Sequence, residues 1–276
     1  MKTIAYSIIF IFLLMGCDQS TEVKVENPDV NILFLHHSTG MNVYKGKRDF
    51  LSGILSRFEK YTVPSLIEEY NIQNGAKIAI REQAFPKGSP YPWSNYPYDY
   101  YNIWVKNGGT EPFMEEPTLE MLTADYDVIV FKHCFPVSNI LPNDSVSDIN
   151  SDKKTIGNYT LQYQALKEKL HSFGNTKFII WTGAALTKAS TTEEIALRAR
   201  EFFDWVVNEW DEPGDNIFVW DFRKLQVGEG LYLPDEKAKN AWDSHLDPDF
   251  GELAAHEFTK YLIEVANTNI SSNRSE

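Results

Sequence analysis

Ile32-Leu33-Phe34-Leu35 is a continuous apolar run, and His36-His37-Ser38-Thr39-Gly40 follows it directly. A short apolar run without alternation predicts a β-strand that is buried on both faces. The abrupt change to polar residues and glycine predicts that this strand ends near His36 and that the chain then turns. A strand of this kind is typical of a parallel sheet covered by helices on both sides.

The same pattern recurs along the chain. The expected strands are 31–36, 77–83, 127–132, 177–182 and 216–221, and three of them read almost continuously apolar: Ile-Leu-Phe-Leu, Val-Ile-Val-Phe and Phe-Ile-Ile-Trp. Stretches with helical spacing lie between or after them, at 63–71, 118–123, 159–173, 192–210 and 250–266. Alternation of strands and helices predicts an α/β fold with a doubly wound parallel sheet. Because no Pro/Gly/Ser linker divides residues 30–267, we expect a single domain there.

Polar residues able to do chemistry follow the predicted strands. Ligands of such sheets bind beyond the carboxyl ends of the strands, so these residues are expected at one edge. Ser38 is a candidate nucleophile, although a serine after a strand also serves as a helix N-cap. His245 is a candidate general base for Ser38, and Asp243 is a candidate for fixing its tautomer.

The order and spacing of these residues resemble those of the SGNH/GDSL hydrolase superfamily. The resemblance implies a flavodoxin-like three-layer sandwich with a mostly parallel five-stranded sheet, and an esterase that needs no cofactor. It assigns Ser38, His245 and Asp243 to catalysis, and Gly88 and Asn139 to the oxyanion hole beside the Ser38 N–H.

This chain departs from the family pattern at three points. His37 stands where an Asp usually precedes the nucleophile, and Asp243 is two residues before His245 rather than three. The block after the third strand lacks Gly-x-Asn-Asp, so Ser138 or His133 are alternative oxyanion donors to Asn139.

Other chemistries at the same edge are less favoured. His36, His37 and His245 are possible zinc ligands, but adjacent histidines at a strand end point to opposite faces. The acidic residues Asp247, Asp249 and Glu252 lack the spacing of a calcium loop. Cys134, a possible thiol nucleophile, ends a buried strand, where a cysteine is usually a small core residue. We therefore expect no metal.

Residues 85–104 hold eight aromatic side chains and four prolines. Tyrosine and tryptophan carry apolar faces with polar tips, which suit a partly wet binding surface. This segment follows the second strand, so Tyr91, Trp93, Tyr96 and Trp104 are expected to form a stacking wall for a sugar. The alternative is a loop that packs its aromatic side chains as a satellite core.

The amino terminus carries the features of a secretory signal, with Lys2 followed by an apolar run that ends at Cys17. Leu14-Met15-Gly16-Cys17 resembles a bacterial lipobox, which implies a signal peptide at 1–16 and lipidation of Cys17. Residues 17–29 are then a tether, and 268–276 are a polar tail. We therefore expect a protein secreted across the inner membrane and held at a bacterial membrane by its lipid anchor only.

Charge narrows the class of partner. The chain has 26 Lys and Arg against 39 Asp and Glu, a formal net charge of -13, which disfavours nucleic acid. Together these features predict a cell-envelope serine esterase whose substrate is a small-molecule or glycan ester, plausibly an acetylated glycan. The alternative is a non-catalytic glycan-binding lipoprotein with the same fold. The sequence leaves the oligomeric state open.

Overall fold

A computed structural model describes residues 22–47 and 61–269 of the chain. Its centre is one sheet of five parallel strands in the order β2-β1-β3-β4-β5. The strands are β1 (Val30–His36), β2 (Ile78–Ala84), β3 (Val128–Phe131), β4 (Lys177–Trp181) and β5 (Ile217–Trp220). This order is the flavodoxin-like one, so the predicted fold class is confirmed.

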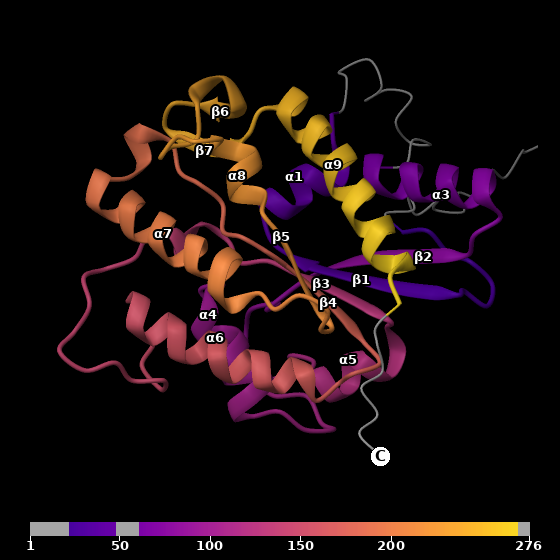
Figure 1. Ribbon diagram of the computed structural model, residues 1–276, viewed down its shortest axis with the longest axis horizontal. Helices are drawn as coiled ribbons and strands as arrows, with labels where there is room; N and C mark the ends of the chain where they lie inside the picture. Colours follow the sequence, from indigo (N-terminus) through magenta and orange to yellow (C-terminus); the bar gives the residue numbers. More distant parts are fainter. Residues whose placement is uncertain (1–21, 48–60, 270–276) are drawn as a thin grey trace, which may run out of the picture.

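Helices cover both faces of the sheet (Figure 1). One face carries α1 (Thr39–Lys45), α3 (Thr62–Asn74) and α9 (Pro248–Asn267), which contact one another. The other face carries α4 (Pro97–Tyr100), α5 (Leu119–Asp125), α6 (Ile156–His171) and α7 (Glu193–Trp205). The short helix α8 (Phe222–Val227) follows β5. The molecule is therefore a three-layer sandwich.

Alternation along the strands divides the core into two clusters. Leu33 and Leu35 of β1 face the α6 side, whereas Ile32 and Phe34 face the α9 side. Successive strand residues point to opposite faces, so an unbroken apolar run is what a strand between two helical layers requires. This requirement explains the apolar runs of β1, β3 and β4, whereas β2 carries Arg81, Glu82 and Gln83 and is partly exposed there.

The predicted helices are also present, with shifted ends. The expected helix at 192–210 is α7 followed by a π-helical turn, η5 (Val206–Trp210). A similar turn, η2 (Tyr101–Lys106), continues α4. Short 3-10 turns complete the structure: η3 (Phe135–Ser138), η4 (Lys188–Ser190) and η6 (Asp235–Lys237).

The domain begins before the predicted boundary at residue 30. Val23 is buried and forms an antiparallel bridge with Ile80, with N···O distances of 2.8 and 3.2 Å. It thereby occupies hydrogen-bonding groups on the edge strand β2. The expected tether is therefore too long at its carboxyl end. The predicted signal peptide and Cys17 lie outside the described residues, as does most of the polar tail. No helix in the described ranges is long and apolar enough to cross a membrane.

Two features place chemical groups at the carboxyl edge of the sheet. β1 is followed at once by the turn into α1, and β1 and β3 are neighbours at the point where the strand order reverses. After α8, the strands β6 (Ala238–Asn240) and β7 (Asp243–Leu246) form a small antiparallel sheet. β7 contacts α1, which brings Asp243 and His245 of β7 close to the helix that follows β1.

Candidate active site

Ser38 lies in the turn between β1 and α1 with an unusual backbone. Its φ is 48° and its ψ is -103°, a conformation that L-residues rarely adopt. Strained residues of this kind persist where the surrounding structure holds them, and they concentrate at functional sites. Ser38 occupies the N-cap position of α1, but its side chain accepts no capping hydrogen bond. The helix-cap interpretation is therefore wrong for this serine.

The Ser38 hydroxyl instead contacts the ring of His245. Ser38 Oγ and His245 Nε2 form a hydrogen bond, although 207 residues separate them in the chain. His245 comes from β7, which packs on the amino end of α1. The structure thus brings together the two side chains that the sequence assigned as nucleophile and base.

Asp243 completes the arrangement. Its Oδ1 lies 2.5 Å from His245 Nδ1 and accepts the His245 backbone N–H at 3.1 Å. The two residues belong to the extended strand β7, where residues i and i+2 share a face. A spacing of two is therefore sufficient here.

Protonation of the ring follows from these contacts. A carboxylate can only accept, so Nδ1 carries the proton and Nε2 is free to accept from the Ser38 hydroxyl. Donation by the His245 ring, then by its backbone N–H and by Lys239, holds the pKa of Asp243 well below its usual range. Asp243 is therefore ionised at neutral pH, as this tautomer requires.

The site is open to solvent. The side chains of His245 and Asp243 are 42% and 30% exposed, and Lys239 Nζ lies 3.1 Å from the second oxygen of Asp243. The Phe135 ring packs edge-on against the His245 ring, with centroids 5.2 Å apart. One side of the histidine ring thus packs on an apolar side chain, the ring is partly open to water, and Ser38 beside it is half-buried.

His37 and Trp93 form the rim next to Ser38. Their rings stack with centroids 4.2 Å apart and planes 8° apart. His37 Nε2 donates to the carbonyl of Pro86 at 2.6 Å, and burial lowers the pKa of His37, so its ring is neutral at pH 7. Trp93 itself is 37% exposed. This tryptophan is therefore available to a ligand beside the nucleophile.

The rest of the predicted stacking wall is wrong. Tyr91, Tyr96 and Trp104 are buried, with exposed fractions of 3%, 5% and 0%. Their polar groups are satisfied inside the protein: the Tyr91 hydroxyl donates to Asp99, the Tyr96 hydroxyl to the Asp152 carbonyl, and the Trp104 ring N–H to the Pro117 carbonyl. All three rings belong to the core on the α6 side of the sheet. The satellite-core alternative describes them better.

Gly88 is not an oxyanion donor in this structure. Its backbone N–H donates to the carboxylate of buried Glu116 at 3.2 Å, beside the N–H of Lys87 at 2.5 Å. The glycine is required for a different reason, because its φ is 116° and a Cβ there would lie 2.9 Å from the Trp93 ring. Gly88 therefore shapes the loop that carries Trp93.

Asn139 remains a prediction as an oxyanion residue. It follows η3, its side chain is exposed, and within the described ranges no contact links it to Ser38 or His245. Both alternatives are engaged in the core, since Ser138 Oγ donates to the Ala184 carbonyl at 2.7 Å and His133 Nε2 contacts the Tyr163 hydroxyl at 2.7 Å.

The backbone N–H of Ser38, unlike that of Gly88, is not engaged within the described residues. No acceptor within residues 22–47 and 61–269 takes it. It is therefore the donor best placed for an oxyanion next to Ser38 Oγ.

Sequence reasoning missed two residues near the site. Trp242 directly precedes Asp243 and is 78% exposed, the kind of apolar exposure that marks binding surfaces. Lys132 directly follows β3, is fully buried, and donates from Nζ to the carbonyl of His37 at 3.1 Å. A lysine at the end of a continuous apolar run was the available signal for the second residue.

The histidines do not converge on a metal. The His36 ring is buried with Nε2 3.2 Å from the Glu82 carboxylate, whereas His37 binds Pro86 and His245 binds Ser38. Cys134 is a buried free thiol, as a core residue would be.

The three acidic residues near α9 are each used separately. Asp247 caps α9, Asp249 pairs with Lys47 Nζ at 2.5 Å, and Glu252 accepts from the Lys47 backbone N–H and the Thr62 hydroxyl. They do not form a calcium site.

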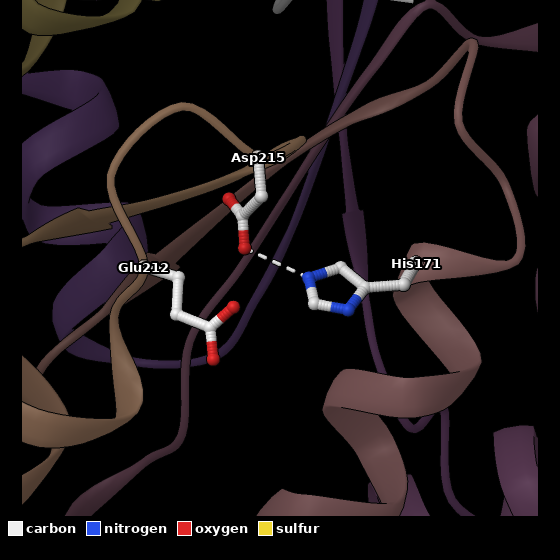
Figure 2. A group of neighbouring side chains, drawn as sticks. All are labelled: His171, Glu212 and Asp215. Carbon is white, nitrogen blue, oxygen red and sulfur yellow. Dashed lines mark hydrogen bonds and ion pairs between the residues drawn. The ribbon is translucent and has the colours of Figure 1, made fainter. Parts of the chain in front are cut away.

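Among the described residues, one group has the spacing of metal ligands: His171, Glu212 and Asp215 (Figure 2). It lies at the end of α6 and just before β5, at the opposite edge of the sheet from Ser38. His171 Nε2 lies 2.8 Å from Asp215 Oδ2, and Glu212 is paired with Lys167 Nζ at 2.6 Å. Both carboxylates thus have cationic or hydrogen-bonding partners already, and the group has no connection with the serine.

No protein-family model matches the chain, and no curated protein matches it. Among solved structures, the chain is similar to a carbohydrate esterase whose active site is described as displaying divergent catalytic and non-catalytic binding functions. The two are 12% identical, the match covers 88% of this chain and 67% of the other, and the TM-score is 0.40. A likeness at this level carries no argument about the reaction.

Proposed function

We propose that this protein is a serine hydrolase of carboxylic esters, with Ser38 as nucleophile, His245 as general base and Asp243 as the acid that orients it. The observation that carries the proposal is the chain of contacts from Ser38 Oγ to His245 Nε2 and from His245 Nδ1 to Asp243. A nucleophile bonded to a base, which is oriented in turn by a third group, is the arrangement that activates a serine.

The reaction proceeds by acyl transfer. Ser38 Oγ attacks the ester carbonyl while its proton passes to His245 Nε2, and a tetrahedral intermediate forms. His245 returns the proton to the leaving alkoxide, so the alcohol departs and the acyl group stays on Ser38. Water then attacks the acyl group, gives its proton to His245, and the carboxylic acid leaves as Ser38 recovers its hydrogen. No cofactor takes part in these steps.

The negative charge of the tetrahedral intermediate needs hydrogen-bond donors. The N–H of Ser38 is the first, because it lies beside the reacting oxygen and no described residue accepts from it. A donor of this kind contributes roughly 3 kcal/mol to stabilisation of the transition state. Asn139 is the second candidate, on the family resemblance alone.

The substrate we propose is an ester on a carbohydrate, with an acetylated glycan as the first candidate. Trp93, stacked on His37 next to Ser38, and Trp242, next to Asp243, are both exposed. Exposed tryptophan next to a nucleophile suits the apolar face of a sugar ring. The buried members of the former stacking wall play no part in this proposal.

The place of action we propose is the bacterial cell envelope, with Cys17 as the lipidated residue. The proposal rests on the signal-like amino terminus and on Leu14-Met15-Gly16-Cys17. Metabolic labelling of the expressed protein with an alkyne fatty acid is expected to mark the wild type. Absence of label from wild type, or equal labelling of Cys17→Ala, contradicts the anchor.

A fluorophosphonate probe tests the reaction itself. It forms an O–P bond with an activated serine and releases fluoride, so wild type should be labelled at Ser38. The Ser38→Ala variant should not be labelled. Ser172→Ala is the matched control, since Ser172 is exposed at the far end of α6 and its hydroxyl donates to the Lys169 carbonyl, away from Ser38.

The outcome separates the proposal from its rival. Folded wild-type protein that takes no label, yet binds glycans on a panel, is a non-catalytic glycan-binding protein. Labelled protein that releases acetate from acetylated glycans, with the release lost in His245→Ala, supports the esterase and its substrate class.

A further inference from the structure

Lys132 is a buried cation in an unusual place. Its side chain is fully buried directly after β3, beside the end of β1 where the strand order reverses. Within the described ranges no carboxylate forms an ion pair with it. A buried ammonium without a carboxylate costs several kcal/mol of desolvation. Because Lys132 lies at the strand ends where ligands bind, a buried charge with this desolvation cost is a candidate functional group.

The side chain of Lys132 contacts the turn that carries Ser38. Nζ donates to the His37 carbonyl at 3.1 Å. The aliphatic part lies under Gly40, where a Cβ would be 3.0 Å from Lys132 Cδ. The Tyr100 hydroxyl donates to the Lys132 carbonyl at 2.8 Å and fixes its backbone. Lys132 is thus held in place and reaches one acceptor, the peptide between His37 and Ser38.

That peptide also carries the Ser38 N–H. In a trans peptide the carbonyl and the N–H point in opposite directions. An ammonium that holds the His37 carbonyl toward the interior therefore turns the Ser38 N–H the other way. The charge also polarises the peptide and strengthens its N–H as a donor.

We infer that Lys132 is a positioning residue that holds the Ser38 turn in its strained conformation and aims the Ser38 N–H at the oxyanion. This inference rests on the proposed function, because it gives that N–H its catalytic task. Lys132 does not touch the substrate: it acts through the peptide.

Protonation of Lys132 offers a readout. Burial lowers the pKa of Lys132 to about 8. The groups that face it are His36 of β1, His37 of the turn after β1, Glu82 of β2 behind His36, and His133 and Cys134, which follow Lys132 in the chain. Burial lowers the pKa of each of the three histidines, so they are neutral at pH 7 and do not change charge above it. A lysine with a lowered pKa loses its proton as the pH rises through about 8, so its hold on the carbonyl weakens on the alkaline side.

The test compares labelling rates at Ser38. Lys132→Met keeps an unbranched apolar side chain that reaches as far as Cε and removes the ammonium. At pH 7 we expect the variant to react with the fluorophosphonate roughly 100-fold more slowly than wild type, the loss typical of a misplaced donor. The wild-type rate should fall as the pH rises through about 8. The labelling rate of Lys132→Met should not fall in this pH range. The rate of Cys134→Ala should fall as that of wild type does, which separates Lys132 from the neighbouring thiol.

Lys177→Met is the matched control. Lys177 also donates from Nζ to backbone carbonyls, those of Val265 and Ala266, but at the opposite edge of the sheet. Its substitution should leave the labelling rate per folded molecule unchanged. A labelling rate of Lys132→Met within about threefold of wild type overturns the inference, since a donor at this position changes rates by about 100-fold.

A second measurement does not depend on catalysis. In amide spectra of wild type, the Ser38 and Thr39 signals should shift with a midpoint near the Lys132 pKa of about 8. Signals that stay constant overturn the inference, whether or not Lys132→Met folds. Failure of wild type to take label at Ser38 counts against the proposed function, whereas the amide titration decides the role of Lys132 in either case.

Discussion

Replacement of Asp243 by asparagine tests how this site uses its acid. The Asp243 carboxylate accepts two N–H groups of His245 through Oδ1 and pairs with Lys239 through Oδ2. In Asp243→Asn the amide oxygen can keep both His245 contacts, while the new NH2 faces Lys239. Lys239 is 66% exposed, so its side chain can turn away into water. The histidine therefore keeps its orientation and tautomer.

The lower rate expected of Asp243→Asn then comes mainly from the removal of one negative charge beside the imidazolium formed in the reaction. Two unit charges about 4 Å apart attract by ~1 kcal/mol in water and ~4 kcal/mol at a protein surface. Because the two side chains are 42% and 30% exposed, the middle of this range applies. About 2 to 2.5 kcal/mol corresponds to a rate ~30- to 70-fold lower. Buried triads lose ~10,000-fold on the same change because the tautomer reverses.

The assay is kcat/KM for p-nitrophenyl acetate, with Lys239→Met as the control that removes only the outer partner of Asp243. Asp243→Asn should lose roughly 30- to 70-fold, and the control at most a few-fold. A loss of about 10,000-fold would show that the asparagine reverses the histidine tautomer, and the reasoning from exposure would be refuted. A loss below about threefold would remove Asp243 from the mechanism altogether.

Three further results are expected. Gly40→Ala should lower the midpoint of urea unfolding, because the new Cβ would lie 2.5 Å from that of His36 and overpacking costs ~1–3 kcal/mol. This cost exceeds the ~1 kcal/mol by which alanine favours a helix over glycine. A variant more stable than wild type would contradict the close contact between Gly40 and His36. Trp104→Ala should lower the free energy of unfolding by ~3–5 kcal/mol and Trp93→Ala by far less, since Trp104 is fully buried and Trp93 is not. Equal losses in calorimetry would contradict the assignment of Trp104 to the core and of Trp93 to the surface. Trp93→Ala should instead raise KM for acetylated glycans with little change for p-nitrophenyl acetate, and equal effects on both substrates would argue against a sugar platform at Trp93.

The fold was predictable because its decisive signal is local. A strand between two helical layers must be apolar on both faces, and the runs in β1, β3 and β4 have that property within a few residues each. The order of the strands along the chain then places their carboxyl ends at one edge. Ser38 and His245 could be nominated from their places after β1 and before α9, without knowledge of any contact.

The aromatic segment shows where such reasoning fails. Tyr96, Tyr100 and Trp104 are spaced by four residues, which is the repeat of one helix face, and that face is buried against the sheet. The spacing was present in the sequence, but the density of prolines favoured an open loop. Composition counts aromatic rings, whereas exposure depends on what lies against them.

The sequence by itself determined the layers, the strands and the edge at which the chemistry collects, because periodicity and apolar runs are properties of neighbouring residues. Only the tertiary structure decided that Ser38 bonds His245 rather than caps α1. It also decided that Gly88 gives its N–H to Glu116 and that Lys132 holds the His37 carbonyl. These outcomes depend on hydrogen-bond partners from distant segments, and a backbone group has room for few partners at once. Which partner it takes is fixed by the angles and distances of the packed chain.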